Sequence, residues 1–209
     1  MTRRLISVPI LTAFFLFLQI LLPTDPFESR GSHWIELVDV VKAEEAHELL
    51  KIYSVLKSHR TDLSNDLTWS ISKTILEEST KHSFDPALIL AVISVESSFQ
   101  QAAISRKGAR GFMQIRPFVA NALAREVDLG LNSKDRILDP ESLYDPILNI
   151  KLGVFYLNNL RNYFRDLKLA LTAYNWGPTE IRSRIERQEA IPFGYATKVL
   201  STYYKFQRG

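Results

Sequence analysis

The segment PALILAVISVESSF, residues 86–99, decides how the rest of the sequence is interpreted. Asp85 and Pro86 form a typical helix start, because aspartate accepts a hydrogen bond from a free first-turn N–H group and proline presets the backbone angle of the first helical position. Apolar residues then cover nearly the whole circumference of the helix. A helix of this kind belongs in the interior of a domain, so the sequence predicts a buried central helix.

Glu96 is the one acidic residue of this segment and lies in its last turns. Burial and the negative end of the helix dipole both disfavour the ionised carboxylate, so we expect a raised pKa. A raised pKa suits a general acid at neutral pH. The alternative is a glutamate at a helix end that simply turns into the solvent.

The segment after Glu96 is cationic and contains no acid before Glu126. Its basic residues are Arg106, Lys107, Arg110, Arg116 and Arg125. Gly108 and Gly111, three residues apart, indicate sharp turns or a place where a ligand approaches the backbone. The candidate acid is therefore followed by a loop that offers no second carboxylate.

Three groups of residues occur in a characteristic order. They are Glu96-Ser97-Ser98-Phe99; then Ser105, Gly108-Ala109, Gly111-Phe112-Met113-Gln114-Ile115 and Pro117; and then Ala173-Tyr174-Asn175-Trp176-Gly177-Pro178. Together they resemble the soluble lytic transglycosylase (SLT) family, over roughly Leu67 to Phe206. The resemblance implies an all-α, lysozyme-like catalytic domain that cleaves the glycan strands of bacterial peptidoglycan.

The resemblance also implies roles for individual residues. Glu96 corresponds to the single catalytic acid/base of the family. The residues that correspond to the substrate-binding cleft and the loop that shapes it are Ser105, Gly108, Gly111, Met113, Gln114, Tyr174 and Asn175. A helix expected to pack behind the active site is matched by Asn149, Gly153, Tyr156 and Leu157.

The chain departs from the family pattern at three positions. Phe112 stands where leucine is usual, and Trp176 stands where a small residue is common. Either aromatic ring suits stacking on a sugar, although packing in the core is the commoner fate of large aromatics. The segment before Tyr195 lacks the Glu-Thr pair that often precedes the last helix, which leaves the alignment of Tyr195 open.

The chemistry implied by the resemblance needs one carboxyl group. Glycoside hydrolysis usually uses two carboxylates. In lytic transglycosylases the N-acetyl group of N-acetylmuramic acid (MurNAc) assists cleavage of its β-1,4 bond to N-acetylglucosamine (GlcNAc), and the C6 hydroxyl then closes a 1,6-anhydro-MurNAc end. Two alternatives remain: a goose-type-lysozyme-like hydrolase, in which Asp85, Glu77 or Glu78 approaches Glu96, and a non-catalytic peptidoglycan-binding scaffold.

Other classes of function have little support in the sequence. The histidines, His33, His47, His59 and His82, show no metal-ligand spacing, and cysteine is absent, so we expect no metal and no cofactor. A formal net charge of +3 is too small to indicate a nucleic-acid-binding protein. The expected partner is the peptidoglycan strand, and no residue indicates which cell-envelope machinery the protein serves.

The N-terminus predicts export. Arg3 and Arg4 precede an uncharged segment, residues 5–22, so residues 1–24 are expected to be a signal anchor or signal peptide. With the arginines held inside, the remainder faces the periplasm, anchored in the inner membrane or released after cleavage. Residues 25–65 are expected to form a tether and an amphipathic helix, Glu44–His59, that packs on the domain or serves a partner. Residues 66–209 form the expected catalytic domain.

Helical periodicity and Asp-Pro start signals predict the helices of this domain. The expected ranges are Leu67–Lys81, Pro86–Phe99, Pro117–Val127, Pro146–Phe164, Leu167–Tyr174, Pro178–Gln188 and Ala196–Phe206.

Overall fold

The computed structural model describes residues 29–60, 62–124, 126 and 137–208, with side chains from residue 39 onward. The expected export segment, residues 1–24, lies outside the described residues. Of the helices that are described, none has the length and apolar character to cross a membrane. Residues Glu45–Gly209 form one compact unit, separate from the residues before them, and the site lies within this unit.

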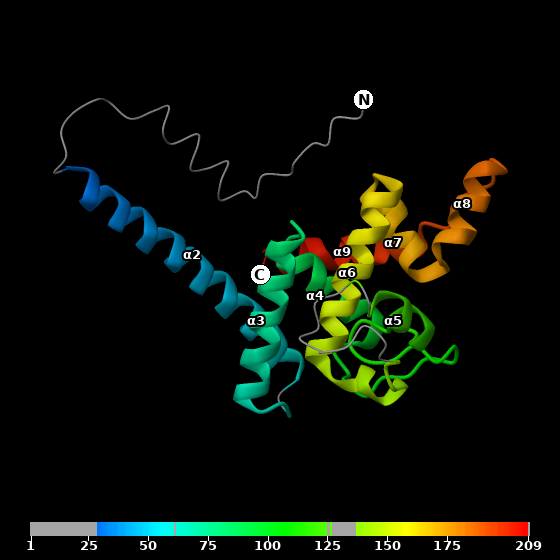
Figure 1. The fold of residues 1–209 in the computed structure, drawn as a ribbon, viewed down its shortest axis with the longest axis horizontal. Helices are drawn as coiled ribbons and strands as arrows, with labels where there is room; N and C mark the ends of the chain where they lie inside the picture. Colours follow the sequence, from blue (N-terminus) through cyan, green and yellow to red (C-terminus); the bar gives the residue numbers. More distant parts are fainter. Residues whose placement is uncertain (1–28, 61, 125, 127–136, 209) are drawn as a thin grey trace. The chain divides into compact units, whose positions relative to one another are not determined.

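The described residues form helices and no β-strand, which confirms the all-α prediction (Figure 1). The helices are α2 (Ser29–His59), α3 (Asn65–Lys81), α4 (Pro86–Ser97), α5 (Pro117–Leu123), the 3-10 helix η1 (Pro140–Tyr144), α6 (Pro146–Phe164), α7 (Leu167–Trp176), α8 (Pro178–Glu186) and α9 (Gly194–Arg208). Isolated β-bridges join Ile104 to Arg110 and Arg110 to Ile115 in the loop between α4 and α5.

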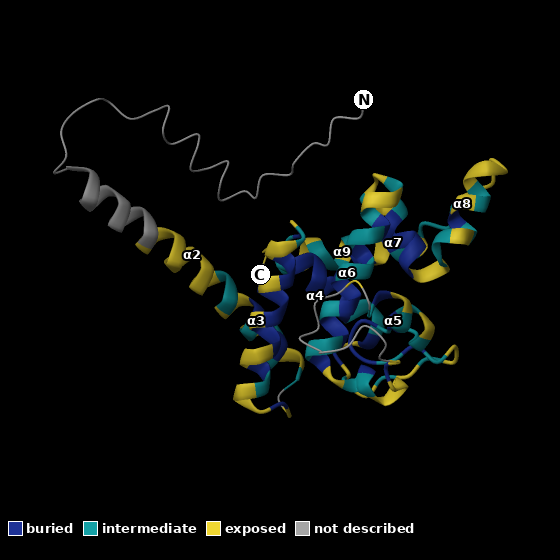
Figure 2. Ribbon diagram, in the orientation of Figure 1, coloured by how far each residue is buried: buried dark blue, intermediate teal, exposed yellow. Residues whose placement is uncertain are grey.

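Helix α4 is the buried central helix that its composition predicts. The Asp85 carboxylate caps it by accepting a hydrogen bond of 2.8 Å from the Ala87 N–H group. All residues from Ala87 to Ile93 are buried (Figure 2). Helix α4 packs chiefly against α9 and also against α3. Burial of this many apolar side chains is the main source of stability for such a helix.

The C-terminal part of α2 belongs to the same core. Ile52 and Leu56 are almost completely buried, and the ring of Tyr53 meets Trp69 of α3 edge-on at 5.9 Å between ring centroids. The apolar side of the helix expected over Glu44–His59 therefore packs on the compact unit. The helix itself begins earlier, at Ser29, because no proline and no glycine after Gly31 interrupts the sequence before His59.

Candidate active site

Glu96 occupies the last turn of α4, immediately before an unusual reversal of the chain. The two residues after the helix, Ser98 and Phe99, both have left-handed backbone angles, with φ of 50° and 61°. Phe99 is fully buried, and its carbonyl oxygen accepts a hydrogen bond of 2.5 Å from the Arg60 guanidinium. Left-handed angles are costly for non-glycine residues. Burial of the ring and the contact with Arg60 hold this turn and thereby fix the end of α4.

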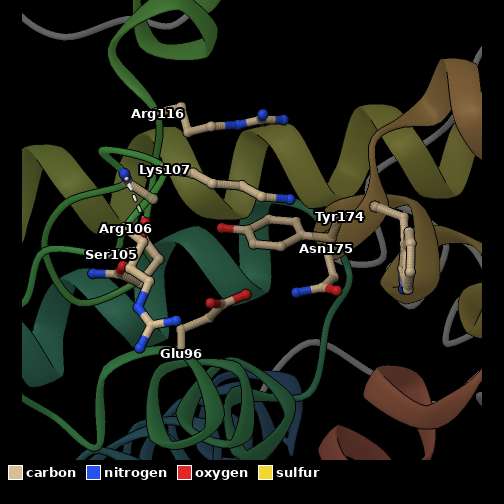
Figure 3. A pocket seen from close by; sticks show the side chains of 10 residues that line it. Glu96, Ser105, Arg106, Lys107, Arg116, Tyr174 and Asn175 are labelled. Atoms are coloured by element: carbon tan, nitrogen blue, oxygen red, sulfur yellow. Dashed lines mark hydrogen bonds between the residues drawn. The ribbon is translucent and has the colours of Figure 1, made fainter.

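The Glu96 side chain lines a cavity of about 460 Å³ (Figure 3). The other lining residues come from the loop between α4 and α5 and from the end of α7. They are Ser105, Arg106, Lys107, Ala109, Gln114, Arg116, Tyr174, Asn175 and Trp176. The cavity thus brings together segments that are about eighty residues apart in the sequence.

The loop on one side of the cavity is held by its own hydrogen bonds. Ser105 closes a turn, because its hydroxyl accepts a bond of 3.0 Å from the Ala109 N–H and its carbonyl accepts one of 2.9 Å from Gly108. The Gln114 side-chain amide donates to the carbonyl oxygens of Ala103 and Gly111 at 3.0 and 2.9 Å. The side chains of Ser105 and Gln114 are therefore held in fixed positions beside the cavity.

Asn149 of α6 anchors this loop from behind. Its Oδ1 accepts a bond of 2.7 Å from the Met113 N–H, and its Nδ2 donates to the carbonyl oxygens of Arg110 and Leu143 at 2.9 and 2.8 Å. The side chain is fully buried. Gly111 has a φ of +77°, and a Cβ there would overlap Asn149 and the Leu143 carbonyl oxygen. Glycine is therefore required at position 111 for the loop to approach α6.

Tyr174 and Asn175 form the opposite side of the cavity at the end of α7. The Tyr174 hydroxyl donates a bond of 2.8 Å to the Met113 carbonyl oxygen, which ties α7 to the loop. Burial and the nearby negative charge of Glu96 raise the pKa of Tyr174 well above 10, so its hydroxyl keeps its proton. Asn175 is exposed and faces the cavity with its amide group.

The environment of Glu96 favours its protonated form. Burial raises the pKa of Glu96 from 4.5 to about 7, against a hydrogen bond from Tyr195 and the positive charge of Lys198, which both lower it. The Tyr195 hydroxyl donates to Glu96 Oε1 at 2.6 Å. Burial and the Glu96 charge raise the pKa of Tyr195 well above 10, so Tyr195 remains the donor. Glu96 is therefore close to half-protonated at neutral pH.

The structure brings five of the predicted site residues together around the cavity: Glu96, Ser105, Gln114, Tyr174 and Asn175. Two others, Gly111 and Met113, are buried behind the loop and do not line the cavity. Met113 is instead packed against Gly153 of α6, which has no side chain to exclude it. These two residues shape the cleft from behind.

The aromatic departures from the family pattern lie in different environments. Phe112 is fully buried in the core, so its ring does not face the cavity. Trp176 is 49% exposed and lines the cavity, where it is available to a ligand. The sequence left the alignment of Tyr195 with the family pattern open, and in the structure the Tyr195 hydroxyl is in direct contact with Glu96. The only indication of this contact in the sequence was a tyrosine at the start of the last helix.

No second carboxylate lines the cavity among the described residues. Asp85 caps the other end of α4, about 16 Å away along the helix, and accepts hydrogen bonds from Tyr203 and Gln207. Glu78 lies in α3 beside His82, with 3.6 Å between its Oε2 and Nε2 of that ring. No cluster of three potential metal ligands occurs in the described part of the chain.

The raised pKa of Glu96 predicts a pH-dependent gain in stability for Glu96→Gln. The folded protein holds this proton up to a pH of about 7 and the unfolded chain only to 4.5, so the contribution of Glu96 to stability is complete below pH 4.5 and is lost as the pH rises through 7. Glutamine does not titrate. We therefore expect the free energy of unfolding of the variant, relative to that of the wild type, to rise by up to about 3 kcal/mol between pH 4 and pH 8.

Urea unfolding of both proteins at a series of pH values measures this difference. A constant difference in the free energy of unfolding from about pH 4 to pH 8 would show that Glu96 titrates normally.

The sequence and fold were compared with known proteins. Residues 73–193, more than half of the chain, match the family of the transglycosylase SLT domain. Membrane-bound lytic murein transglycosylase C of Photorhabdus laumondii is 37% identical over 111 residues, which cover 49% of this chain and 30% of the relative. Membrane-bound lytic murein transglycosylase E of Buchnera aphidicola is 45% identical over 86 residues, which cover 40% of this chain and 38% of the relative.

Two solved structures share the fold. The lytic transglycosylase Slt of Pseudomonas aeruginosa, solved as an inactive mutant, aligns with a TM-score of 0.55 and 26% identity over 65% of this chain and 24% of its own. The 70 kDa soluble lytic transglycosylase of Escherichia coli aligns with a TM-score of 0.58 and 22% identity over 80% of this chain and 31% of its own. The chain spans about a third of the length of the curated relatives it matches. The matched residues include the Glu96 turn, the loop that follows it and the end of α7, and the chain belongs to the transglycosylase SLT domain family.

Proposed function

We propose that the protein is a peptidoglycan lytic transglycosylase and that Glu96 is its only acid/base. The observation that carries this proposal is a carboxyl group with a pKa of about 7, the one carboxyl that lines the cavity among the described residues. Membership of the SLT family supports the same reaction, as do the names of the relatives, which are lytic murein transglycosylases.

The reaction uses Glu96 twice. Protonated Glu96 first donates its proton to the glycosidic oxygen, and the bond between that oxygen and C1 of MurNAc breaks while the N-acetyl group of the same sugar supports the cation. The Glu96 carboxylate then removes the proton of the C6 hydroxyl, whose oxygen forms the new bond to C1. The product is a 1,6-anhydro ring, no water is consumed, and Glu96 ends protonated as it began.

The surrounding side chains fit the positioning part of this task. Tyr195 holds Oε1 of Glu96 and leaves the other carboxyl oxygen for the substrate. The polar side chains of Ser105, Gln114 and Asn175 line the cavity, where sugar hydroxyl and N-acetyl groups need hydrogen-bond partners. Trp176 presents an exposed ring at the same cavity, suited to stacking on a sugar.

A hydrolase is the weaker candidate. Two-carboxylate hydrolysis needs a second acid within about 5–10 Å of the first, and the described lining of the cavity contains Glu96 alone. A non-catalytic scaffold has no use for a desolvated carboxyl group, whose ionisation is costly. Neither alternative explains the raised pKa as well as proton transfer does.

We further infer that residues 1–24 carry the protein across or into the inner membrane, with residues 66–209 acting as the catalytic domain in the periplasm. Arg3, Arg4 and the uncharged segment that follows support this arrangement. The membrane-bound names of the relatives are consistent with it. A protease-accessibility assay on intact spheroplasts tests the orientation, because digestion of the domain from outside is expected and its protection would contradict it.

Digestion of purified peptidoglycan tests the proposed reaction. The full chain in mild detergent is expected to release soluble glycan fragments without a matching rise in reducing ends, because each cut closes an anhydro ring. A rise in reducing ends equal to the number of cuts would indicate hydrolysis, and the absence of released fragments would favour a binding role.

The contact between Tyr195 and Glu96 predicts the pH dependence of the rate. The reaction starts from protonated Glu96, so kcat/KM is expected to fall as the pH rises through about 7. The Tyr195 hydrogen bond lowers the pKa of Glu96, and Tyr195→Phe removes it. We therefore expect the fall to move to higher pH, together with a rate loss of about tenfold from poorer orientation.

Tyr203→Phe is the matched control, since Tyr203 lies on the same helix and donates to Asp85 at the far end of α4. Its pH profile should equal that of the wild type. A Tyr195→Phe profile with an unchanged midpoint would contradict the assigned role.

A further inference from the structure

The loop wall of the cavity carries positive charge that the proposed proton transfers do not use. Arg106, Lys107 and Arg116 line the cavity together with Glu96, and their side chains extend from the loop into it (Figure 3). We call these three residues the cationic wall. Among the described residues none of the three forms an ion pair with a carboxylate, whereas the neighbouring Arg110 pairs with Glu141.

Several arginines elsewhere on the described surface are paired with acids. Pairs of this kind are Arg60–Asp62, Arg182–Glu186, Arg184–Glu180 and Arg187–Glu189. The cationic wall differs because the sequence between Glu96 and Glu126 contains no acid that could reach it locally. The three charges therefore have no carboxylate partner in their own segment, and all three side chains line the cavity.

The backbone fixes where these side chains begin. Arg106 and Lys107 are the two central residues of a turn closed by the bond of 2.9 Å from the Gly108 N–H to the Ser105 carbonyl. Arg116 follows the bridge between Arg110 and Ile115, and its guanidinium lies over the Phe118 ring at 4.6 Å. All three cations are thus displayed by a hydrogen-bonded loop rather than by a loose segment.

The cationic wall does not serve Glu96 itself. The cation that lowers the pKa of Glu96 is Lys198 of α9, and the wall residues are not among the groups that shift it. Because the Glu96 carboxyl is about half-protonated at pH 7, it balances only a small part of the positive charge of the three cations. A neutral sugar chain gains little from three cations, so the ligand of the wall is expected to be anionic.

We propose that the cationic wall binds carboxylate groups that hang from the glycan strand beside the bond to be cut. Guanidinium and ammonium groups bind carboxylates through charge-assisted hydrogen bonds, and guanidinium can do so with two parallel bonds. In peptidoglycan the carboxylate comes either from the lactyl group of a bare MurNAc or from a stem peptide. The inference rests on the proposed function, since it takes the cavity to be the glycan cleft.

Binding measurements in the Glu96→Gln background test this proposal, because no strand is cut during the titration. The wall variant is Arg106→Gln, Lys107→Gln and Arg116→Gln combined. Its matched control removes three exposed lysines that do not line the cavity: Lys51→Gln, Lys73→Gln and Lys205→Gln. Both are made in the full chain and titrated by calorimetry with three probes: a neutral chitin oligosaccharide, glycan strands with free lactyl groups, and strands that keep their stem peptides.

The wall variant is expected to bind at least one anionic probe about tenfold more weakly, since three partly exposed charge pairs each contribute a few-fold. The neutral probe should change less than about twofold, and the loss should shrink when salt is raised. The control should bind all probes like its parent. A loss of affinity for the strands with free lactyl groups identifies the lactyl carboxylate as the ligand. A loss of affinity confined to the strands that keep their stem peptides identifies a carboxylate of the peptide.

An equal loss of affinity for the neutral probe, or no loss of affinity for either anionic probe, would overturn the proposal. Its failure remains distinguishable from failure of the proposed function. If the wall variant loses affinity for an anionic probe but the wild-type chain cleaves no strand, only the catalytic proposal is refuted. If the wild-type chain gives anhydro products but the wall variant binds every probe like its parent, only the proposal about the cationic wall is refuted.

Discussion

Glu96→Gln is expected to lower the rate of glycan cleavage by about 10³-fold, the largest catalytic effect of any single change in this chain. Glutamine keeps the size of the side chain and can still accept the hydrogen bond from Tyr195, but it has no acid proton to give to the glycosidic oxygen. Because no other carboxyl lines the described cavity, no neighbour is placed to replace it. Turnover of soluble peptidoglycan fragments measures the loss.

The controls separate chemistry from folding. Glu77→Gln removes a carboxylate of α3 that pairs with Lys73 on the surface, and its activity should be that of the wild type. Glu96→Gln should bind glycan strands as tightly as the wild type and unfold at equal or higher denaturant concentration near pH 8. Cleavage at more than about a tenth of the wild-type rate would remove Glu96 from the role of general acid.

Asn149→Ala is expected to destabilise the fold by about 3–5 kcal/mol, because it leaves buried backbone groups without hydrogen-bond partners. The side chain makes three bonds, one from the Met113 N–H and two to the carbonyl oxygens of Arg110 and Leu143, in a fully buried position. Alanine satisfies none of them and leaves a void. Urea unfolding monitored by circular dichroism gives the change in the free energy of unfolding.

Asn159→Ala on the same helix is the matched control, since Asn159 is only half-buried and the change in helix propensity is the same. It should shift stability by less than about 1 kcal/mol. Asn149→Ala should also reduce cleavage at temperatures where the protein is folded, because the loop that carries Gln114 and Ser105 loses its anchor. A stability change as small as that of Asn159→Ala would show that α6 does not hold the loop.

The fold followed closely from local signals in the sequence. Asp-Pro pairs mark the starts of α4 and α6, where the aspartates accept first-turn hydrogen bonds as predicted. Helix α6 has the predicted bounds, Pro146–Phe164, because a capping residue begins it and the left-handed Arg165 ends it. Helix α5 ends at Leu123 rather than continuing to Val127, and η1 was not predicted, since so short a helix leaves almost no periodic pattern.

The candidate site was predictable where residues lie close together in the sequence. The location of Glu96 at the end of an apolar helix predicted the raised pKa, and burial is its largest cause. The contact between Tyr195 and Glu96 joins residues 99 positions apart, and periodicity cannot predict a contact of that separation. Gly111 and Met113 belong to the loop that the resemblance assigned to the cleft, and their packing against α6 could not be read from the sequence.

Mass spectrometry of peptidoglycan digested in heavy-oxygen water is the measurement that tests the central claim most directly, namely that Glu96 alone cleaves the strand without water. The wild-type chain is expected to yield fragments that end in 1,6-anhydro-MurNAc, one water lighter than hydrolysed fragments and free of heavy oxygen, and Glu96→Gln is expected to yield none. Fragments with reducing ends that carry one heavy oxygen would contradict the claim and establish a hydrolase instead.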